Sequence, residues 1–157
     1  MKITLDLLQA KRACVEGIRY FQQNFGVEAD YQDVLDKLAE DDKPDWAEWL
    51  IQNVGADRGA VKIVTEQPKA KHLFAAGSLL LNVFVSISGD IKAGSGIKAG
   101  WGIEAGWGIE AGGDIKAGGD IKAGRSIEAG RSIEAGRSIE AGWGIEAGWG
   151  IEAGWGI

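Results

Sequence analysis

Hydrophobic and polar positions alternate with a fixed period of six residues from Gly89 to Ile157. Each unit reads x-[G/D/S]-I-[K/E]-A-G, without insertion or deletion. Residues two apart on a β-strand share a face, so the Ile and Ala of each unit lie on one face and the charged residue between them on the other. The pattern predicts one short strand per unit, three strands per triangular coil of about 18 residues, and about five coils stacked into a β-helix.

The same six-residue frame extends backwards through less regular sequence. Pro68 interrupts the frame, and Val61 and Ile63 resume it. We therefore expect the β-helix to begin near Ala60, with Val61 and Ile63 facing inwards and Thr65–His72 forming a loop. Between this loop and the strict repeat, steps of six reach three apolar pairs: Leu73 and Ala75, Leu79 and Leu81, and Val85 and Ile87.

A glycine follows every Ala of the repeat, from Gly94 to Gly154. Glycine adopts positive φ without steric cost, so we expect these residues to turn the chain at the corners of the coil. Their recurrence indicates one geometric requirement that every unit shares.

The N-terminal third carries a helical pattern instead. Apolar residues spaced by three, four and seven predict an amphipathic helix over Ile3–Phe25. Capping residues and proline position predict two further helices, over Asp30–Glu40 and Pro44–Val54. Three short helices bury little core on their own, so we expect this unit to pack against the first coil.

The sequence therefore predicts an α+β fold with two units. Residues 1–58 form a short helical cap, and residues 59–157 form the triangular β-helix, of which residues 89–157 are the strict repeat.

Charge and cysteine content exclude several classes of function. The net charge is −6, with acidic and basic residues interleaved, which argues against a nucleic-acid or anionic-membrane surface. The single Cys allows no intramolecular disulfide, and charges stand where a secretory leader would be apolar. The most apolar stretch, Leu73–Ile87, is too short to span a membrane. We expect a cytoplasmic protein.

No catalytic or metal-binding constellation stands out. Cys14 and His72 are a conceivable nucleophile and base, but nothing in the sequence brings them together, and we expect Cys14 in the core and His72 on the surface. One His and one Cys cannot supply an ordinary zinc site, and the glycines lead into strands rather than phosphate-binding helices. The sequence predicts a protein that is not an enzyme and uses no cofactor.

The first position of each unit carries the candidate interaction residues. Residues 18 apart stack on successive coils, so Trp107, Arg125 and Trp143 lie above one another. Because the same position accepts Arg and Gly, we expect the Trp side chains to point outwards, with Arg stacked on the indole rings. The residues predicted to form a partner surface are Trp101, Trp107, Arg125, Arg131 and Arg137.

The acidic positions also stack. Glu110, Glu128 and Glu146 share one column, and such a ladder of like charges can mimic DNA phosphates. The interleaved Lys and Arg residues argue against a continuous negative field, so a DNA-mimic β-helix is only an alternative.

The C-terminal coil is predicted to self-associate. An uncapped β-helix end exposes strand edges and apolar side chains, which association of two copies would cover. We expect a dimer or a filament, with the contact made by Trp143, Trp149, Trp155, Ile151 and Ile157.

The GDIKAG units resemble the core of bactofilins, right-handed triangular β-helices that form nucleotide-free cytoskeletal polymers. The resemblance covers residues 73–157 at most. Left-handed hexapeptide β-helices, as in acyltransferases, favour a small residue two positions before the aliphatic one, where this chain mostly has Trp or Arg. The resemblance therefore implies a right-handed coil.

The overall layout, LLQAKRAC and WAEWLI followed by GDIKAG and WGIEAG units, is similar to small proteins encoded by phages and prophages. This similarity implies a protein-interaction scaffold that inhibits a host protein complex, such as a defence system. The bactofilin resemblance implies the alternative, a structural polymer made of copies of the chain.

Overall fold

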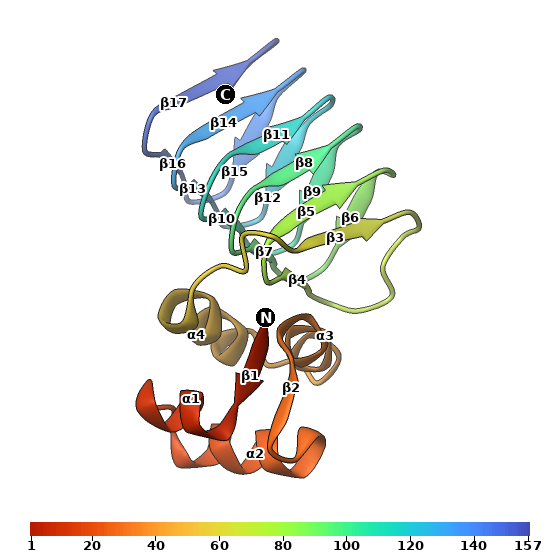
Figure 1. The fold of residues 1–157 in the computed structure, drawn as a ribbon. Coiled ribbons are helices and arrows are strands. Elements are labelled where there is room, and N and C mark those ends of the chain that lie inside the picture. The colour runs from red at the N-terminus through yellow and green to blue at the C-terminus, as the bar shows by residue number, and fades with distance from the viewer.

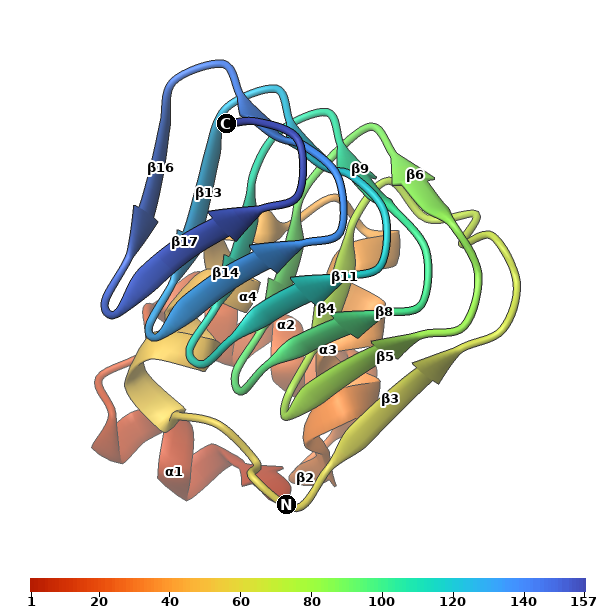
Figure 2. The same cartoon turned by 90° about the horizontal axis from the view of Figure 1, so that it is seen from above.

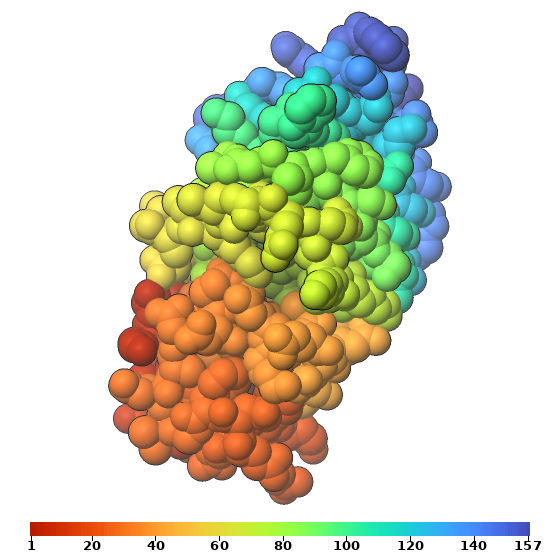
Figure 3. All heavy atoms as spheres, turned by 90° about the vertical axis from the view of Figure 1, so that its right-hand side faces the viewer, coloured from red at the N-terminus to blue at the C-terminus, as the bar shows by residue number.

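The computed structural model describes residues 1–157, which form a helical cap followed by a β-solenoid of about five coils. The two parts lie end to end, with the cap below the first coil in Figure 1. The space-filling view shows the coils continuing away from the cap towards the C-terminus (Figure 3). The predicted α+β fold class is confirmed.

The first helical stretch is two helices rather than the single helix predicted. Helix α1 spans Leu5–Ala10 and α2 spans Val15–Phe25. Between them Arg12 takes a φ of 60°, and the Cys14 side chain accepts a hydrogen bond from the Gly17 backbone N–H at 3.3 Å, which starts a new helix. Apolar spacing continues across the break, which explains why the pattern alone predicted one helix.

The rest of the cap follows the prediction closely. Helix α3 spans Tyr31–Glu40, with Asp30 as its N-cap, and α4 spans Pro44–Val54, followed by Gly55. The sequence did not predict a short antiparallel pair formed by strands β1, Lys2–Thr4, and β2, Glu28–Asp30.

The cap and the first coil share a hydrophobic core, as expected. Phe74 and Ala76 of the solenoid are buried in the same cluster as Leu35 and Leu38 of α3. The Gln32 side chain extends this contact, because its amide donates to the Phe74 carbonyl at 2.9 Å and accepts from the Ala76 N–H at 3.0 Å. A side chain thus completes the hydrogen bonds of a strand edge that no other strand covers.

The solenoid consists of three parallel sheets, one on each side of the triangle. Sheet I contains β4 (Leu73–Ala75), β7 (Ile91–Ala93), β10 (Ile109–Ala111), β13 (Ser126–Ala129) and β16 (Gly144–Ala147). Sheet II contains β3 (Val61–Val64), β5 (Ser78–Leu81), β8 (Ile97–Ala99), β11 (Ile115–Ala117), β14 (Ser132–Ala135) and β17 (Gly150–Ala153). Sheet III contains β6 (Val85–Ile87), β9 (Ile103–Ala105), β12 (Ile121–Ala123) and β15 (Ile139–Ala141).

Identical positions stack in register through the solenoid. Ile109 pairs with Ile91 below it and Ile127 above it, and the Ala columns follow the same register. The Ile and Ala columns face inwards and, together with Val and Leu residues of the first coils, form one continuous core of 24 buried residues. The coil is right-handed: seen from the C-terminal end in Figure 2, the chain runs from β16 to β17 counter-clockwise while it rises towards the viewer.

The inward direction predicted for Val61 and Ile63 is wrong. Both side chains are more than half exposed, and Val64 is the buried residue of β3. Lys62 pairs with Leu79 and Val64 with Leu81, a step of 17 residues rather than 18. Because strand side chains alternate, this one-residue difference in the first coil turns every side chain of β3 to the opposite face.

The conformation predicted for the corner glycines is also wrong. Gly26 and Gly55 of the cap are the only glycines with positive φ. In the solenoid the requirement is space: a Cβ added at Gly112 would overlap the carbonyl oxygen of Gly94 one coil below, and one at Gly130 would overlap that of Gly112. At every corner glycine of the repeat except Gly100, the corner one coil below lies too close for a side chain.

Candidate interaction surface

The first corner of the solenoid carries a continuous stack of cations and indole rings. Lys71 Nζ lies 4.4 Å from the centroid of the Trp107 ring, and Arg125 Cζ lies 4.6 Å from the same ring and 5.3 Å from that of Trp143. These distances are in the cation–π range. Lys71 lies two coils below Trp107, with Gly89 at the corner between them, so the four side chains form a single column.

The other two corners repeat the pair in their last coils. Arg131 lies 5.6 Å from the Trp149 ring, and Arg137 lies 5.3 Å from the Trp155 ring. Trp143, Trp149 and Trp155 are 76%, 76% and 77% exposed. The outward direction expected for these Trp side chains is confirmed. We call Trp107, Arg125, Trp143 and these two pairs together the Trp/Arg ladder.

Aspartates in the GDIKAG units anchor the ladder. The Asp114 carboxylate accepts a hydrogen bond from the Ser132 N–H at 3.1 Å and forms an ion pair with Arg131 at 2.9 Å. Asp120 makes the equivalent hydrogen bond to the Ser138 N–H at 3.0 Å. Asp90 accepts the same kind of hydrogen bond from the Gly108 N–H at 2.9 Å, so in each case an Asp side chain of one coil binds a backbone N–H of the next coil.

Trp101 lies apart from these stacks, near the N-terminal end of the third corner. It is 64% exposed, and Phe84, on the preceding coil, is 50% exposed. With Val61 and Ile63 they make four exposed apolar side chains on the first coils. Of these, sequence reasoning found only Trp101, because the others lie outside the strict repeat or on the strand whose register was predicted wrongly.

The predicted glutamate column is present, but Lys residues divide the charge. Glu110, Glu128 and Glu146 pair in register on sheet I, and Lys92 below them binds Glu110 at 3.0 Å. On sheet II, Lys116 binds Glu134 at 2.7 Å. On these two sheets the Lys residues lie nearer the cap and the acidic residues nearer the C-terminus, whereas on sheet III Lys122 lies between Glu104 and Glu140.

Lys92 also connects the solenoid to the cap. Its ammonium group is largely buried and binds the carboxylate of Glu48 on α4 as well as Glu110. Burial lowers the pKa of Lys92, but the hydrogen bond to Glu48 and the charge of Glu110 outweigh it, so the pKa is raised overall. A charged Lys at this junction stabilises the contact between α4 and sheet I.

The positions expected for Cys14 and His72 are both wrong. Cys14 is exposed, whereas the His72 side chain is fully buried. His72 Nδ1 accepts from the Asp90 N–H at 2.9 Å, so Nε2 carries the proton that is donated to Asp42 at 2.7 Å. This bond, with that from Lys71, lowers the pKa of Asp42. His72 is a structural link between the cap and the first two coils.

The residues predicted for self-association lie on the last coils. Ile151 is half-buried and Ile157 is 70% exposed, and both belong to the same repeat units as the exposed Trp149 and Trp155. Their role in association stays a prediction.

The fold and surface define a class: a β-solenoid with a helical N-terminal module and stacked Trp and Arg residues at its corners. Residues 1–56 match the family model of the YdhT N-terminal domain, which covers the helical cap and none of the strands of the solenoid. This family is different from the bactofilins. Neither the curated proteins nor the solved structures gave a match. None of the helices is both long enough and apolar enough to cross a membrane.

Proposed function

We propose that this protein is a non-enzymatic binding scaffold whose recognition surface is the Trp/Arg ladder. The observation that carries the proposal is the exposure of Trp143, Trp149 and Trp155, each stacked on an Arg of the coil below. Trp and Arg dominate the energetic centres of protein interfaces. A rigid solenoid holds these side chains in place before binding, which reduces the entropy lost on association.

We further propose that the partner is a host protein complex and that binding blocks its activity. This part rests on the similarity of the layout, a short helical leader before GDIKAG and WGIEAG units, to small phage and prophage proteins. The surface fits the role of an inhibitor because it offers large side chains for contact and needs no bound substrate.

The test is affinity capture from host extract with a ladder variant, Trp143→Ser, Trp149→Ser and Trp155→Ser. The matched control is Val15→Ser and Val27→Ser, two exposed apolar residues of the cap that lie far from the ladder. We expect one complex to be captured by the wild type and the control and lost by the ladder variant. Capture of the same proteins by all three forms, with circular dichroism unchanged, would contradict the proposal.

Self-association is the second candidate, as a structural polymer or a dimer. The same three exposed Trp residues, together with Ile151 and Ile157, support it because they surround the C-terminal coil. Light scattering with size-exclusion chromatography over a hundredfold concentration range tests it. Growth into filaments favours the polymer, a constant dimer favours a closed contact, and a monomer at all concentrations excludes both.

A DNA-mimic role is less well supported. The ion pairs of Lys92 and Lys116 with stacked glutamates interrupt the negative columns, whereas mimicry of DNA needs a continuous field of one sign.

A further inference from the structure

The helical cap contains a cavity that the Trp/Arg ladder does not use. It is half-open, has a volume of about 290 Å³, and lies between α1, α2, α3 and α4. Its walls are mainly apolar, and the hydrophobic residues that line it include Leu8, Phe21, Leu38, Trp46, Trp49 and Leu50. Every lining residue falls within the segment that matches the YdhT N-terminal domain. The cavity therefore belongs to the module rather than to the solenoid.

The polarity of the cavity restricts what can enter it. The Tyr20 hydroxyl donates to Asp41 at 2.7 Å, and Cys14 Sγ already accepts from the Gly17 N–H. No buried polar side-chain atom of the lining lacks a hydrogen-bond partner. Transfer of a charge into such a site is costly, so the inserted part of a ligand must be uncharged.

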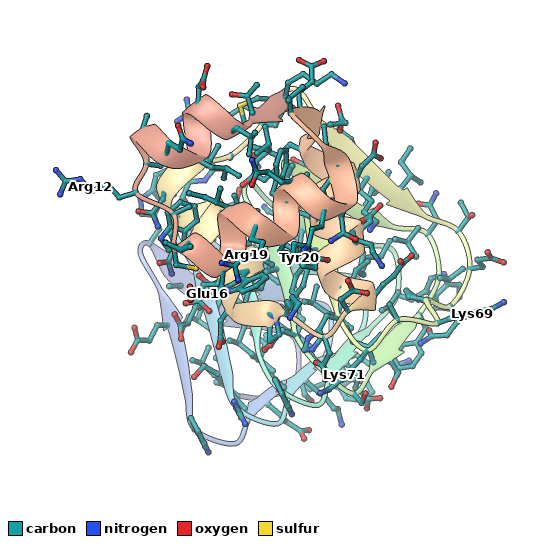
Figure 4. The ribbon with its side chains drawn as sticks, turned by 90° about the horizontal axis from the view of Figure 1, so that it is seen from below. Arg12, Glu16, Arg19, Tyr20, Lys69 and Lys71 are labelled. Atoms are coloured by element: carbon teal, nitrogen blue, oxygen red, sulfur yellow. The ribbon has the colours of Figure 1, made fainter.

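Charged residues stand only at the edge of the cavity. Arg12 and Asp45 both line it and both are exposed. Arg12 projects away from the body of the cap in Figure 4, while Tyr20 lies against the helices. A ligand with an apolar body and a polar end would leave that end in solvent, near these two side chains.

One wall is aromatic and held in place. Tyr20 and Trp46 pack edge to face with ring centroids 5.3 Å apart, and Lys43 Nζ lies 4.5 Å from the Trp46 ring. Phe21 and Trp49 also line the cavity. An aromatic ligand would gain edge or offset contacts with these rings beyond simple burial of area.

Gly17 lines the cavity next to Cys14. It is the third residue of α2, it has no positive φ, and glycine inside a helix costs about 0.5–1 kcal/mol relative to alanine. The backbone does not require glycine there. A Cβ at Gly17 would lie 3.3 Å from Cys14 Sγ, at the wall of the cavity. Glycine therefore leaves room for the Cys14 thiol that caps α2, at the expense of helix stability, and adds no side chain to this part of the cavity wall.

We propose that this cavity binds a small, uncharged aromatic molecule about the size of indole. An apolar cavity of about 150 Å³ holds benzene, so 290 Å³ accommodates a fused two-ring system. A volume of about 290 Å³ is too small for a helix of a partner protein, which docks into a long groove.

The probe for the test is indole, titrated into the ¹⁵N-labelled full chain and followed by NMR. We expect saturable shifts of the indole N–H signals of Trp46 and Trp49 and of the Gly17 amide. The exposed Trp143, Trp149 and Trp155 are internal controls, because non-specific stacking would shift them too. Equal, non-saturating shifts at all Trp residues would overturn the proposal.

Two variants separate binding from folding. Ala13→Phe places a ring in the cavity and should weaken indole binding by about tenfold or more, because the ligand's volume is already filled. Val27→Phe adds the same ring on an exposed site of the cap and should leave binding unchanged. If Ala13→Phe fails to fold, Gly17→Ala should weaken binding while α2 remains helical. Unchanged affinity in the folded cavity variant would refute the site.

The cavity and the ladder are independent. The Trp143, Trp149 and Trp155 triple variant should bind indole as the wild type does, so failure of one proposal leaves the other standing.

Discussion

The close approach of successive corners predicts that two glycines only two residues apart respond in opposite ways to alanine. A Cβ at Gly142 would overlap the carbonyl oxygen of Gly124, whereas a Cβ at Gly144 would meet no atom within 4 Å. Neither residue has positive φ, so backbone strain contributes to neither substitution.

The magnitude follows from the geometry. A carbon and a carbonyl oxygen rarely approach closer than about 3.3 Å, so Gly142→Ala must push the two corners apart by about 1 Å. Overpacking of this kind costs about 1–3 kcal/mol. The substitution would also stretch the hydrogen bond from the Gly142 N–H to the Ala123 carbonyl, which is 3.2 Å long in the wild type. Loss of this bond would add about 0.5–1.5 kcal/mol to the destabilisation. Gly144→Ala should instead stabilise the chain by about 0.4–1 kcal/mol, because it reduces the entropy of the unfolded state.

Guanidinium denaturation followed by circular dichroism measures the difference, and hydrogen exchange locates it. Solenoid stability is nearly a sum of neighbouring interactions, so amides of the coils around Gly142 should exchange faster. Equal stability of the two variants would show that corner contact is not the reason for glycine. Greater stability of Gly142→Ala than of Gly144→Ala would refute the steric argument.

Three further predictions concern the cap and its junction with the solenoid. Gln32→Leu removes the amide that bridges Phe74 and Ala76 and should lower the unfolding free energy by about 1–3 kcal/mol, while Gln23→Leu on the exposed side of α2 changes little in the same denaturant titration. Tyr31→Phe should leave stability unchanged or raise it, because the buried Tyr31 hydroxyl has no hydrogen-bond partner; a clear loss of melting temperature would contradict this. Burial raises the pKa of Tyr31 above its ordinary value of 10.0, and carboxylates raise that of Lys92 above 10.5. A group whose pKa is raised by folding contributes stability below its pKa in the unfolded chain and loses this contribution as the pH rises. The free energy of unfolding should therefore fall above about pH 10. This fall should be less steep in Tyr31→Phe and in Lys92→Met. A denaturation midpoint that is constant from pH 9 to 12 would exclude this linkage.

The sequence predicted a helix or strand correctly wherever the signals for that element lie within its own residues. Every unit of the strict repeat has an inward Ile and Ala, so strand positions and register followed from the pattern. Asp30 and Pro44 marked the starts of α3 and α4 for the same reason. The break between α1 and α2 was missed because its signal is the Cys14 cap, a residue type that seldom has this role.

Non-local contacts account for the errors at the first coil. The first coil, which includes the loop after Val64, contains 17 residues instead of 18. Only the pairing of β3 with β5 shows this difference in length. His72 seemed a surface residue because its partners, Asp42 and the Asp90 amide, come from distant segments. The candidate surface was predictable in composition and direction, since residues 18 apart must stack, but the exposed Phe84 and Ile63 were not.

The sequence by itself determined the solenoid, its sheet faces and the column of Trp and Arg at each corner, because a period of six repeated without error leaves only one way to bury every Ile. Only the tertiary structure decided why the corner glycines are glycine, how the cap joins the first coil, and that four short helices enclose a cavity. Those features depend on the distance between backbones and side chains that are far apart in the chain, and such distances leave no periodic trace in the sequence.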